Sequence, residues 1–212
     1  MKASLKEQRK RAETDSEVER EEQCGWSLPD VIVYPTGGGT GLVGMWKAFS
    51  ELQAVGLIGP RRPRLLAVQS DGCAPFVRAV EQGDRFAEPW AQPETAAAGI
   101  RVPGSVGDFL VIDCIRESNG TAAAVPEIEI RAMQARLATD GAGYTSLETA
   151  AAVLGAAAAR EARLLEAGEQ VVVFDTGAGF KSEPPHLDTS PPISADERDW
   201  DAAISRLGQS LS

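Results

Sequence analysis

Histidine, cysteine and positive charge are all scarce in this 212-residue sequence. The single histidine, His186, cannot build a histidine-rich metal site, so we expect no metal. The three cysteines, Cys24, Cys73 and Cys114, lie far apart and lack metal-ligand spacing. We therefore expect reduced thiols in a cytoplasmic protein.

Long apolar runs are missing as well. No run approaches the ~18 residues of a membrane span, and the N-terminus lacks the hydrophobic stretch of a secretory signal. The net charge of −10 argues against nucleic acid or an anionic membrane as partner. What remains is a composition, 43% hydrophobic and 25% charged, that is typical of a soluble globular protein.

The chain divides into three segments by composition. Residues 1–24 are dense in Lys, Arg and Glu with almost no apolar side chains, which predicts a charged helical or disordered arm. Residues 25–187 alternate between apolar and amphipathic stretches, which predicts one α/β domain. Residues 188–212 form a polar tail, in which we expect a short helix over 196–207.

Apolar β-type runs alternate with amphipathic stretches along the central segment. This order predicts a three-layer, mostly parallel sheet with helices on both faces. The predicted strands are 31–34, 65–69, 121–125 and 171–174, and the last of these has the strongest strand signal. The predicted helices are 41–55, 74–80, 105–117, 126–138 and 147–165.

A glycine-rich turn, residues 37–41, joins the first predicted strand to the first predicted helix. Glycines let backbone N–H groups converge, and a helix N-terminus adds donors with partial positive charge, so the turn can hold a phosphate. The alternative is a plain tight connection without a ligand. The turn lacks the Gly-Lys-Ser/Thr ending of a P-loop. Gly39, Gly41 and Gly44 do have the G-x-G-x-x-G spacing of a dinucleotide site, and Asp71 follows the next strand, so a nucleotide site remains an alternative.

A second glycine turn, residues 175–181, follows the last predicted strand. In open parallel α/β sheets, ligands bind beyond the carboxyl ends of the strands. Both glycine turns occupy such positions. We therefore expect them to share one site.

Together the two turns resemble threonine synthase, within the wider group of pyridoxal-phosphate enzymes that includes tryptophan synthase β chains and serine/threonine dehydratases. The resemblance spans roughly residues 25–183 and implies a tryptophan synthase β-like fold, here incomplete because only the carboxyl-terminal half of the family is matched. It rests on residues 34–49 (YPTGGGTGLVGMWKAF) and 174–181 (FDTGAGFK), with agreement in 66–75, 99–103 and 107–110.

The resemblance implies a cofactor, pyridoxal 5'-phosphate, and roles for particular residues. The cofactor's phosphate is expected at Gly37, Gly38, Gly39 and Thr40, and its pyridine nitrogen is expected to face the hydroxyl of Thr176. A neutral hydroxyl there leaves the ring nitrogen unprotonated, which weakens the electron sink. On the substrate side the candidates are Glu148, in a match to the family's Pro-Glu-Gly-Ala-Ala segment, and Lys181, at the edge of the site.

Two departures from the family bear on activity. The family's Schiff-base lysine lies in a Ser-x-Lys-type motif of its first half, and none of Lys2, Lys6, Lys10, Lys47 and Lys181 lies in such a motif. No catalytic lysine is therefore assigned. The second departure is Thr149, which stands where the family usually has glycine, so we expect added bulk on the substrate side.

The resemblance implies a lyase that converts O-phosphohomoserine and water to threonine and phosphate. Without the lysine, we expect this chain to bind the cofactor weakly and to be inactive alone. One alternative is a non-catalytic remnant or a half-enzyme that needs a separate N-terminal half, and association as a homodimer is a further possibility. Another alternative is an unrelated nucleotide-binding α/β protein.

Overall fold

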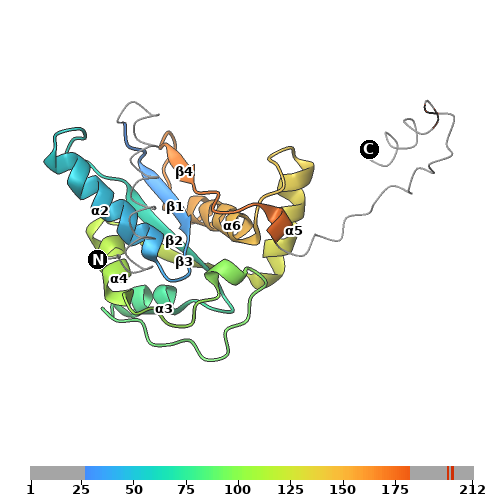
Figure 1. The fold of residues 1–212 in the computed structure, drawn as a ribbon, viewed down its shortest axis with the longest axis horizontal. Coiled ribbons are helices and arrows are strands. Elements are labelled where there is room, and N and C mark those ends of the chain that lie inside the picture. Colours follow the sequence, from blue (N-terminus) through green and yellow to red (C-terminus); the bar gives the residue numbers. More distant parts are fainter. Residues whose placement is uncertain (1–26, 182–199, 201, 203–212) are drawn as a thin grey trace, which may run out of the picture.

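The computed structural model describes residues 27–181 together with 200 and 202. The predicted arm 1–24 lies outside these residues, as does almost all of the tail 188–212 with its predicted helix over 196–207. The described chain forms a four-stranded parallel sheet in the order β3-β2-β1-β4 (Figure 1). Its strands are β1 (Val31–Pro35), β2 (Arg64–Ser70), β3 (Thr121–Val125) and β4 (Val171–Val173).

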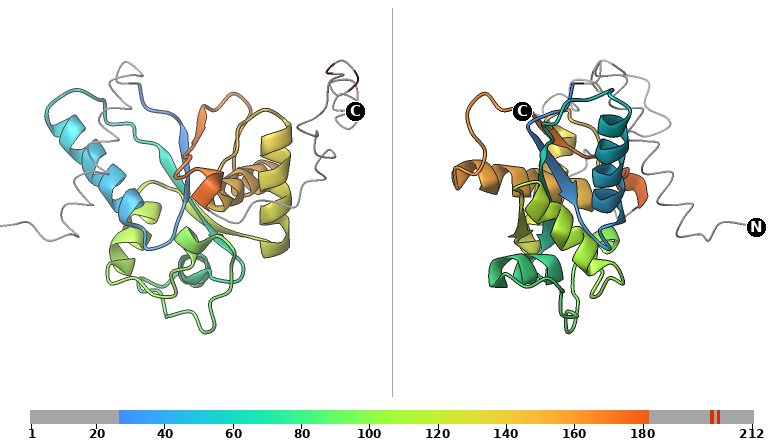
Figure 2. Two further views of the ribbon diagram at one scale, coloured as in Figure 1. Left: turned by 45° about the vertical axis from the view of Figure 1, so that its right-hand side comes forward. Right: turned by 90° about the vertical axis from the view of Figure 1, so that its left-hand side faces the viewer.

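Helices cover both faces of the sheet, as predicted (Figure 2). Because side chains alternate along a strand, Ile32 of β1 packs in the core cluster with Leu42 and Phe49, while Val31 and Val33 pack in the opposite cluster with Ala150. The first face carries α2 (Thr40–Ala54), α3 (Pro75–Gln82) and α4 (Asp108–Glu117). The second face carries α5 (Glu127–Thr139) and α6 (Leu147–Glu161).

Two predicted helices are too long. The helix predicted over 105–117 begins only at Asp108, because the Ser105 hydroxyl accepts the Gly107 N–H and holds the preceding residues in a turn. The helix predicted over 147–165 ends at Glu161, since Arg163 takes a left-handed φ of 58° that a helix cannot continue. Both corrections concern ends of helices, where side-chain contacts and single dihedrals decide.

The strand predicted over 171–174 is the shortest of the four and lies at one edge of the described sheet. Its three valines are only half-buried. An apolar sequence predicts a strand that can be buried. A strand is buried only where another strand lies on each side of it in the sheet. Among the described residues, β4 pairs with β1 alone.

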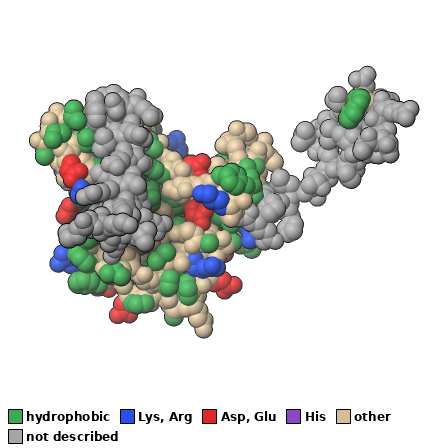
Figure 3. All heavy atoms as spheres, viewed as in Figure 1, with side chains coloured by type: hydrophobic (Ala, Val, Ile, Leu, Met, Phe, Trp, Pro, Cys, Tyr) green, Lys and Arg blue, Asp and Glu red, His purple; other side chains and the backbone are tan. Residues whose placement is uncertain are grey.

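The surface carries both signs of charge. On the face shown in Figure 3, acidic, basic and hydrophobic side chains of the described residues are interspersed. No helix within the described residues is long and apolar enough to cross a membrane.

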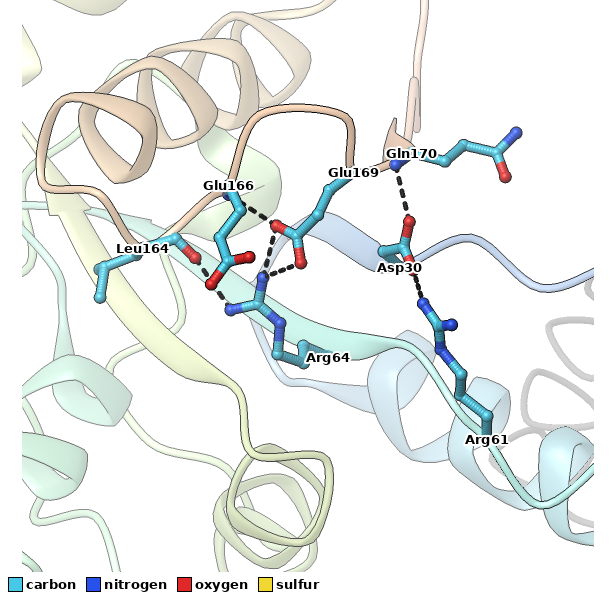
Figure 4. A network of polar contacts seen from close by, with 7 residues as sticks. All are labelled: Asp30, Arg61, Arg64, Leu164, Glu166, Glu169 and Gln170. Carbon is cyan, nitrogen blue, oxygen red and sulfur yellow. Dashed lines mark hydrogen bonds and ion pairs between the residues drawn. The ribbon is translucent and has the colours of Figure 1, made fainter.

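Charged side chains fasten the start of β4 to its neighbours (Figure 4). Arg64, at the start of β2, donates to both carboxylate oxygens of Glu169 at 2.8 and 2.7 Å and to the carbonyl of Leu164 at 2.9 Å. Asp30 accepts the backbone N–H of Gln170 at 2.9 Å and pairs with Arg61. The backbone N–H of Glu166, assisted by Arg64, lowers the pKa of Glu169.

Candidate functional site

The first glycine turn leads directly from β1 into α2. Gly39 is the N-cap of α2 and has a left-handed φ of 76°, which favours glycine. A Cβ at Gly39 would also clash with Val111, and a Cβ at Gly37 would clash with the carbonyl oxygen of Gly99. Gly38 differs, because a Cβ there would meet nothing within 4 Å. Two of the three glycines are therefore required by packing, and the third leaves open space.

The start of α2 is suited to an anion. No side chain caps it, and its first turn contains no acidic residue. The partial positive charge of the helix N-terminus therefore faces the cavity that residues 38–41 line. The Ser105 hydroxyl donates to the carbonyl of Gly38 at 2.8 Å, which fixes the turn from the outside.

The second glycine turn is held against the start of α6. The carbonyl of Gly177 accepts the N–H of Ser146 at 2.8 Å, and Thr145 forms a β-bridge with Ala178. A short 3-10 helix, η2 (Gly179–Lys181), follows. Because β1 and β4 pair in parallel, the turns after them emerge at the same end of the sheet.

One cavity of about 570 Å³ brings all the predicted site residues together. Thr176 and Lys181 line it beside the first glycine turn, and both are exposed to solvent. Residues of both glycine turns therefore line one cavity, whereas a shared ligand site stays a prediction. The predicted residues that line the cavity are Gly37, Gly38, Gly39, Thr40, Glu148, Thr176 and Lys181.

Glu148 reaches across the wall of this cavity. Its carboxylate oxygen Oε1 accepts the backbone N–H of Gly99 at 2.7 Å. Gly99 belongs to the 3-10 helix η1 (Ala98–Ile100), which packs on Gly37. The carboxylate predicted on the substrate side thus also holds the cavity wall. The neighbouring Thr149 does not line the cavity, so the bulk expected there is absent from the described site.

Sequence reasoning missed Gln69. Its side chain is fully buried at the end of β2. Its amide nitrogen donates to the carbonyl of Thr36 at 3.2 Å, and its oxygen accepts the N–H of Phe76 at 2.9 Å and of Val77 at 3.3 Å. One side chain therefore ties the glycine turn to the start of α3. The available signal was a lone amide directly after four apolar strand residues, because a buried polar group needs partners.

Asp71 has a hydrogen-bond partner within the chain. Its carboxylate accepts the backbone N–H of Glu127 at 3.0 Å, at the start of α5. A carboxylate in this position stabilises the helix N-terminus. The feature that kept a nucleotide site open therefore has a structural role.

The sequence profile of the pyridoxal-phosphate dependent enzyme family matches residues 12–177, and the chain belongs to this family. It is 30% identical over 160 residues to the threonine synthase of Methanocaldococcus jannaschii, an alignment that covers 76% of this chain and 39% of that protein. It is 33% identical over 157 residues to the threonine synthase of Methanosarcina acetivorans, with 74% and 38% covered. The chain thus spans about two-fifths of the length of these relatives.

Solved structures support the fold. A fungal L-serine ammonia-lyase from Rhizomucor miehei superposes with a TM-score of 0.63 at 20% identity, covering 78% of this chain and 50% of that one. The processed form of threonine deaminase isoform 2 from Solanum lycopersicum superposes with a TM-score of 0.60 at 18% identity, covering 94% and 48%. The predicted tryptophan synthase β-like α/β fold is therefore confirmed. Because the chain belongs to a family of pyridoxal-phosphate dependent enzymes, the alternative of an unrelated nucleotide-binding α/β protein is not supported.

Proposed function

We propose that this chain binds pyridoxal 5'-phosphate between its two glycine turns, with the phosphate at Gly37, Gly38, Gly39 and Thr40 and the pyridine nitrogen at Thr176. One observation carries the proposal: turns about 140 residues apart in the sequence line a single cavity at the carboxyl ends of β1 and β4. Such edges of parallel α/β sheets are where ligands bind.

The residues present fit this cofactor. At one end the uncapped start of α2 provides backbone N–H groups and positive potential for a phosphate. At the other end the cavity is lined by Thr176, an exposed residue with a neutral hydroxyl. When bound, the cofactor supplies an electron sink that stabilises a carbanion at the α carbon of an amino acid.

The finer activity that we propose is of the threonine synthase type, a carbon–oxygen lyase acting on O-phosphohomoserine. Similarity to the two archaeal threonine synthases supports it. Among the described lysines, Lys47 is ion-paired with Glu51 on α2, and Lys181 lies at the edge of the cavity outside any Ser-x-Lys motif. We therefore expect this chain, tested alone, to bind the cofactor without releasing phosphate from the substrate.

Calorimetric titration with pyridoxal 5'-phosphate tests the binding site. Thr176→Val should weaken binding about tenfold by removing the hydroxyl, whereas Lys47→Gln, a change on the exposed face of α2, should leave affinity unchanged. Equal affinities of all three proteins, or no binding by the unmodified chain, would refute the site.

Mass spectrometry after borohydride treatment tests the expectation that no lysine of this chain forms a Schiff base with the cofactor. Covalent attachment of the cofactor would contradict it. Loss of that attachment in Lys181→Arg would identify Lys181 as the lysine that reacts.

A half-enzyme is the second candidate. It is supported by the outer edge of β4, which carries half-buried valines and pairs with no other strand among the described residues. Co-expression with a separately encoded N-terminal half should then restore phosphate release from O-phosphohomoserine. A stable complex without activity would count against this candidate and favour a non-catalytic remnant.

A further inference from the structure

Thr149 joins the start of α6 to the turn that carries Thr176. Its side chain is almost fully buried, with 5% exposed, and its hydroxyl donates to the carboxylate oxygen Oδ1 of Asp175 at 2.6 Å. Asp175 lies directly before Thr176 in the sequence. Hydrogen bonds from a hydroxyl to a carboxylate are among the shorter and stronger ones in proteins.

The direction of the hydrogen bonds around Thr149 follows from counting protons. Ser146 Oγ lies 3.0 Å from Thr149 Oγ1 and also accepts the Thr149 backbone N–H at 3.1 Å. Each hydroxyl has only one proton. Because the Thr149 proton goes to Asp175, Ser146 must donate its own proton to Thr149. Ser146 lines the cavity, so towards a ligand there it can only accept a hydrogen bond.

Two further features stabilise this connection. The backbone of Ser146 is bonded to Gly177 on the far side of Thr176, so the turn is held both before and after that residue. Asp175 also lies against the first turn of α6, where the partial positive charge of a helix N-terminus favours a carboxylate.

We propose that Thr149 is a positioning residue, which holds residues 175–177 against the start of α6 through Asp175 and so sets how the Thr176 hydroxyl faces the cavity. The role of Thr176 towards pyridoxal 5'-phosphate rests on the proposed function. The hydrogen-bond chain from Ser146 through Thr149 to Asp175 does not depend on it.

Hydrogen exchange without added ligand, followed by mass spectrometry, tests how firmly the turn is held. The reporters are the backbone amides of Ser146, Phe174 and Gly179, which are hydrogen-bonded within and beside the turn. Thr149→Val removes the hydroxyl at nearly the same volume and should speed exchange about tenfold. Thr149→Ser keeps the hydroxyl and should exchange like the unmodified chain. Asp175→Ala should match Thr149→Val, and the double variant should add nothing, because both changes remove one bond. Unchanged exchange in Asp175→Ala and in a folded Thr149→Val overturns the proposal.

Titrations with inorganic phosphate and with pyridoxal 5'-phosphate test the consequence for Thr176. Thr149→Val should weaken the cofactor about tenfold and leave inorganic phosphate unaffected, since phosphate is expected at the other end of the cavity. Faster exchange with unchanged cofactor affinity would overturn the link to Thr176. If the unmodified chain binds neither compound, the proposed function fails, and the exchange result alone decides whether Thr149 holds the turn.

Discussion

The carboxylate of Glu148 and the backbone N–H of Gly99 meet at 2.7 Å in the wall of the cavity, although 49 residues separate them in the chain. Gly99 in turn leaves no room for a side chain at Gly37. The start of α6 is therefore linked through η1 to the glycine turn after β1. This link makes Glu148 a residue that shapes the cavity.

Glu148→Ala should loosen η1. The N–H of Gly99 then loses its acceptor, and we expect the amides of residues 98–102 to exchange several-fold faster. Glu148→Gln retains a side-chain oxygen and serves as the matched variant, with exchange close to that of the unmodified chain. If the two variants exchange equally, the bond does not hold η1. The measurement is hydrogen exchange followed by mass spectrometry.

Alanine should affect stability at Gly39 but hardly at the adjacent Gly38. Gly39→Ala is expected to lower the free energy of unfolding by about 1–3 kcal/mol, because φ is 76° there and Val111 occupies the space. Gly38→Ala should change it by less than about 0.5 kcal/mol, yet it adds a methyl group to the cavity wall and should weaken binding of inorganic phosphate. Urea unfolding and calorimetric titration measure the two effects. A stable Gly39→Ala variant would contradict the structure.

Gln69→Leu should destabilise the fold by about 2 kcal/mol. The substitution leaves the carbonyl of Thr36 and the N–H groups of Phe76 and Val77 buried without their partner. Gln82→Leu, at the exposed end of α3, is the control and should change stability by less than about 0.5 kcal/mol. Urea unfolding compares them, and equal stabilities would show that Gln69 is not needed for its three contacts.

The stability of the chain should fall in acid partly through Glu169. Its pKa is lowered in the folded chain from the ordinary value of 4.5, so its contribution is complete above that pH and disappears as the pH falls through the folded value. Glu169→Gln should lower the melting temperature at neutral pH and flatten its decrease in acid. Glu161→Gln, on an exposed side chain at the end of α6, is the control. A parallel acid decrease in both variants would contradict this role.

Most of the fold could be predicted from the sequence because its signals are local. The uniform apolarity of β2 and the glycine turn before α2 each fall within a few residues, and the observed elements follow them closely. The length of β4 could not be predicted this way. Whether three valines form a buried or an edge strand depends on what pairs beside them.

The two glycine turns of the site could be predicted from the sequence, but the hydrogen bonds that hold them in place could not. The two glycine turns could be placed together because parallel strands end at one edge of the sheet. The contacts that hold them could not, because they join distant residues of ordinary types: Gln69 with Thr36, and Thr149 with Asp175. A threonine where a small residue is usual looks like added bulk in a sequence, and only its rotamer shows that it points to a carboxylate.

The register between β1 and β4 fixes the spacing between the two ends of the site. Val31 pairs with Val171 and Val33 with Val173, so the first glycine turn and Thr176 start from matched positions on adjacent strands. One residue inserted into or deleted from β4 would slide its turn by about 3.3 Å along the sheet and invert its side chains. The length of any ligand that spans both turns is therefore set by backbone pairing between two strands, and side chains in the cavity wall can adjust only its orientation.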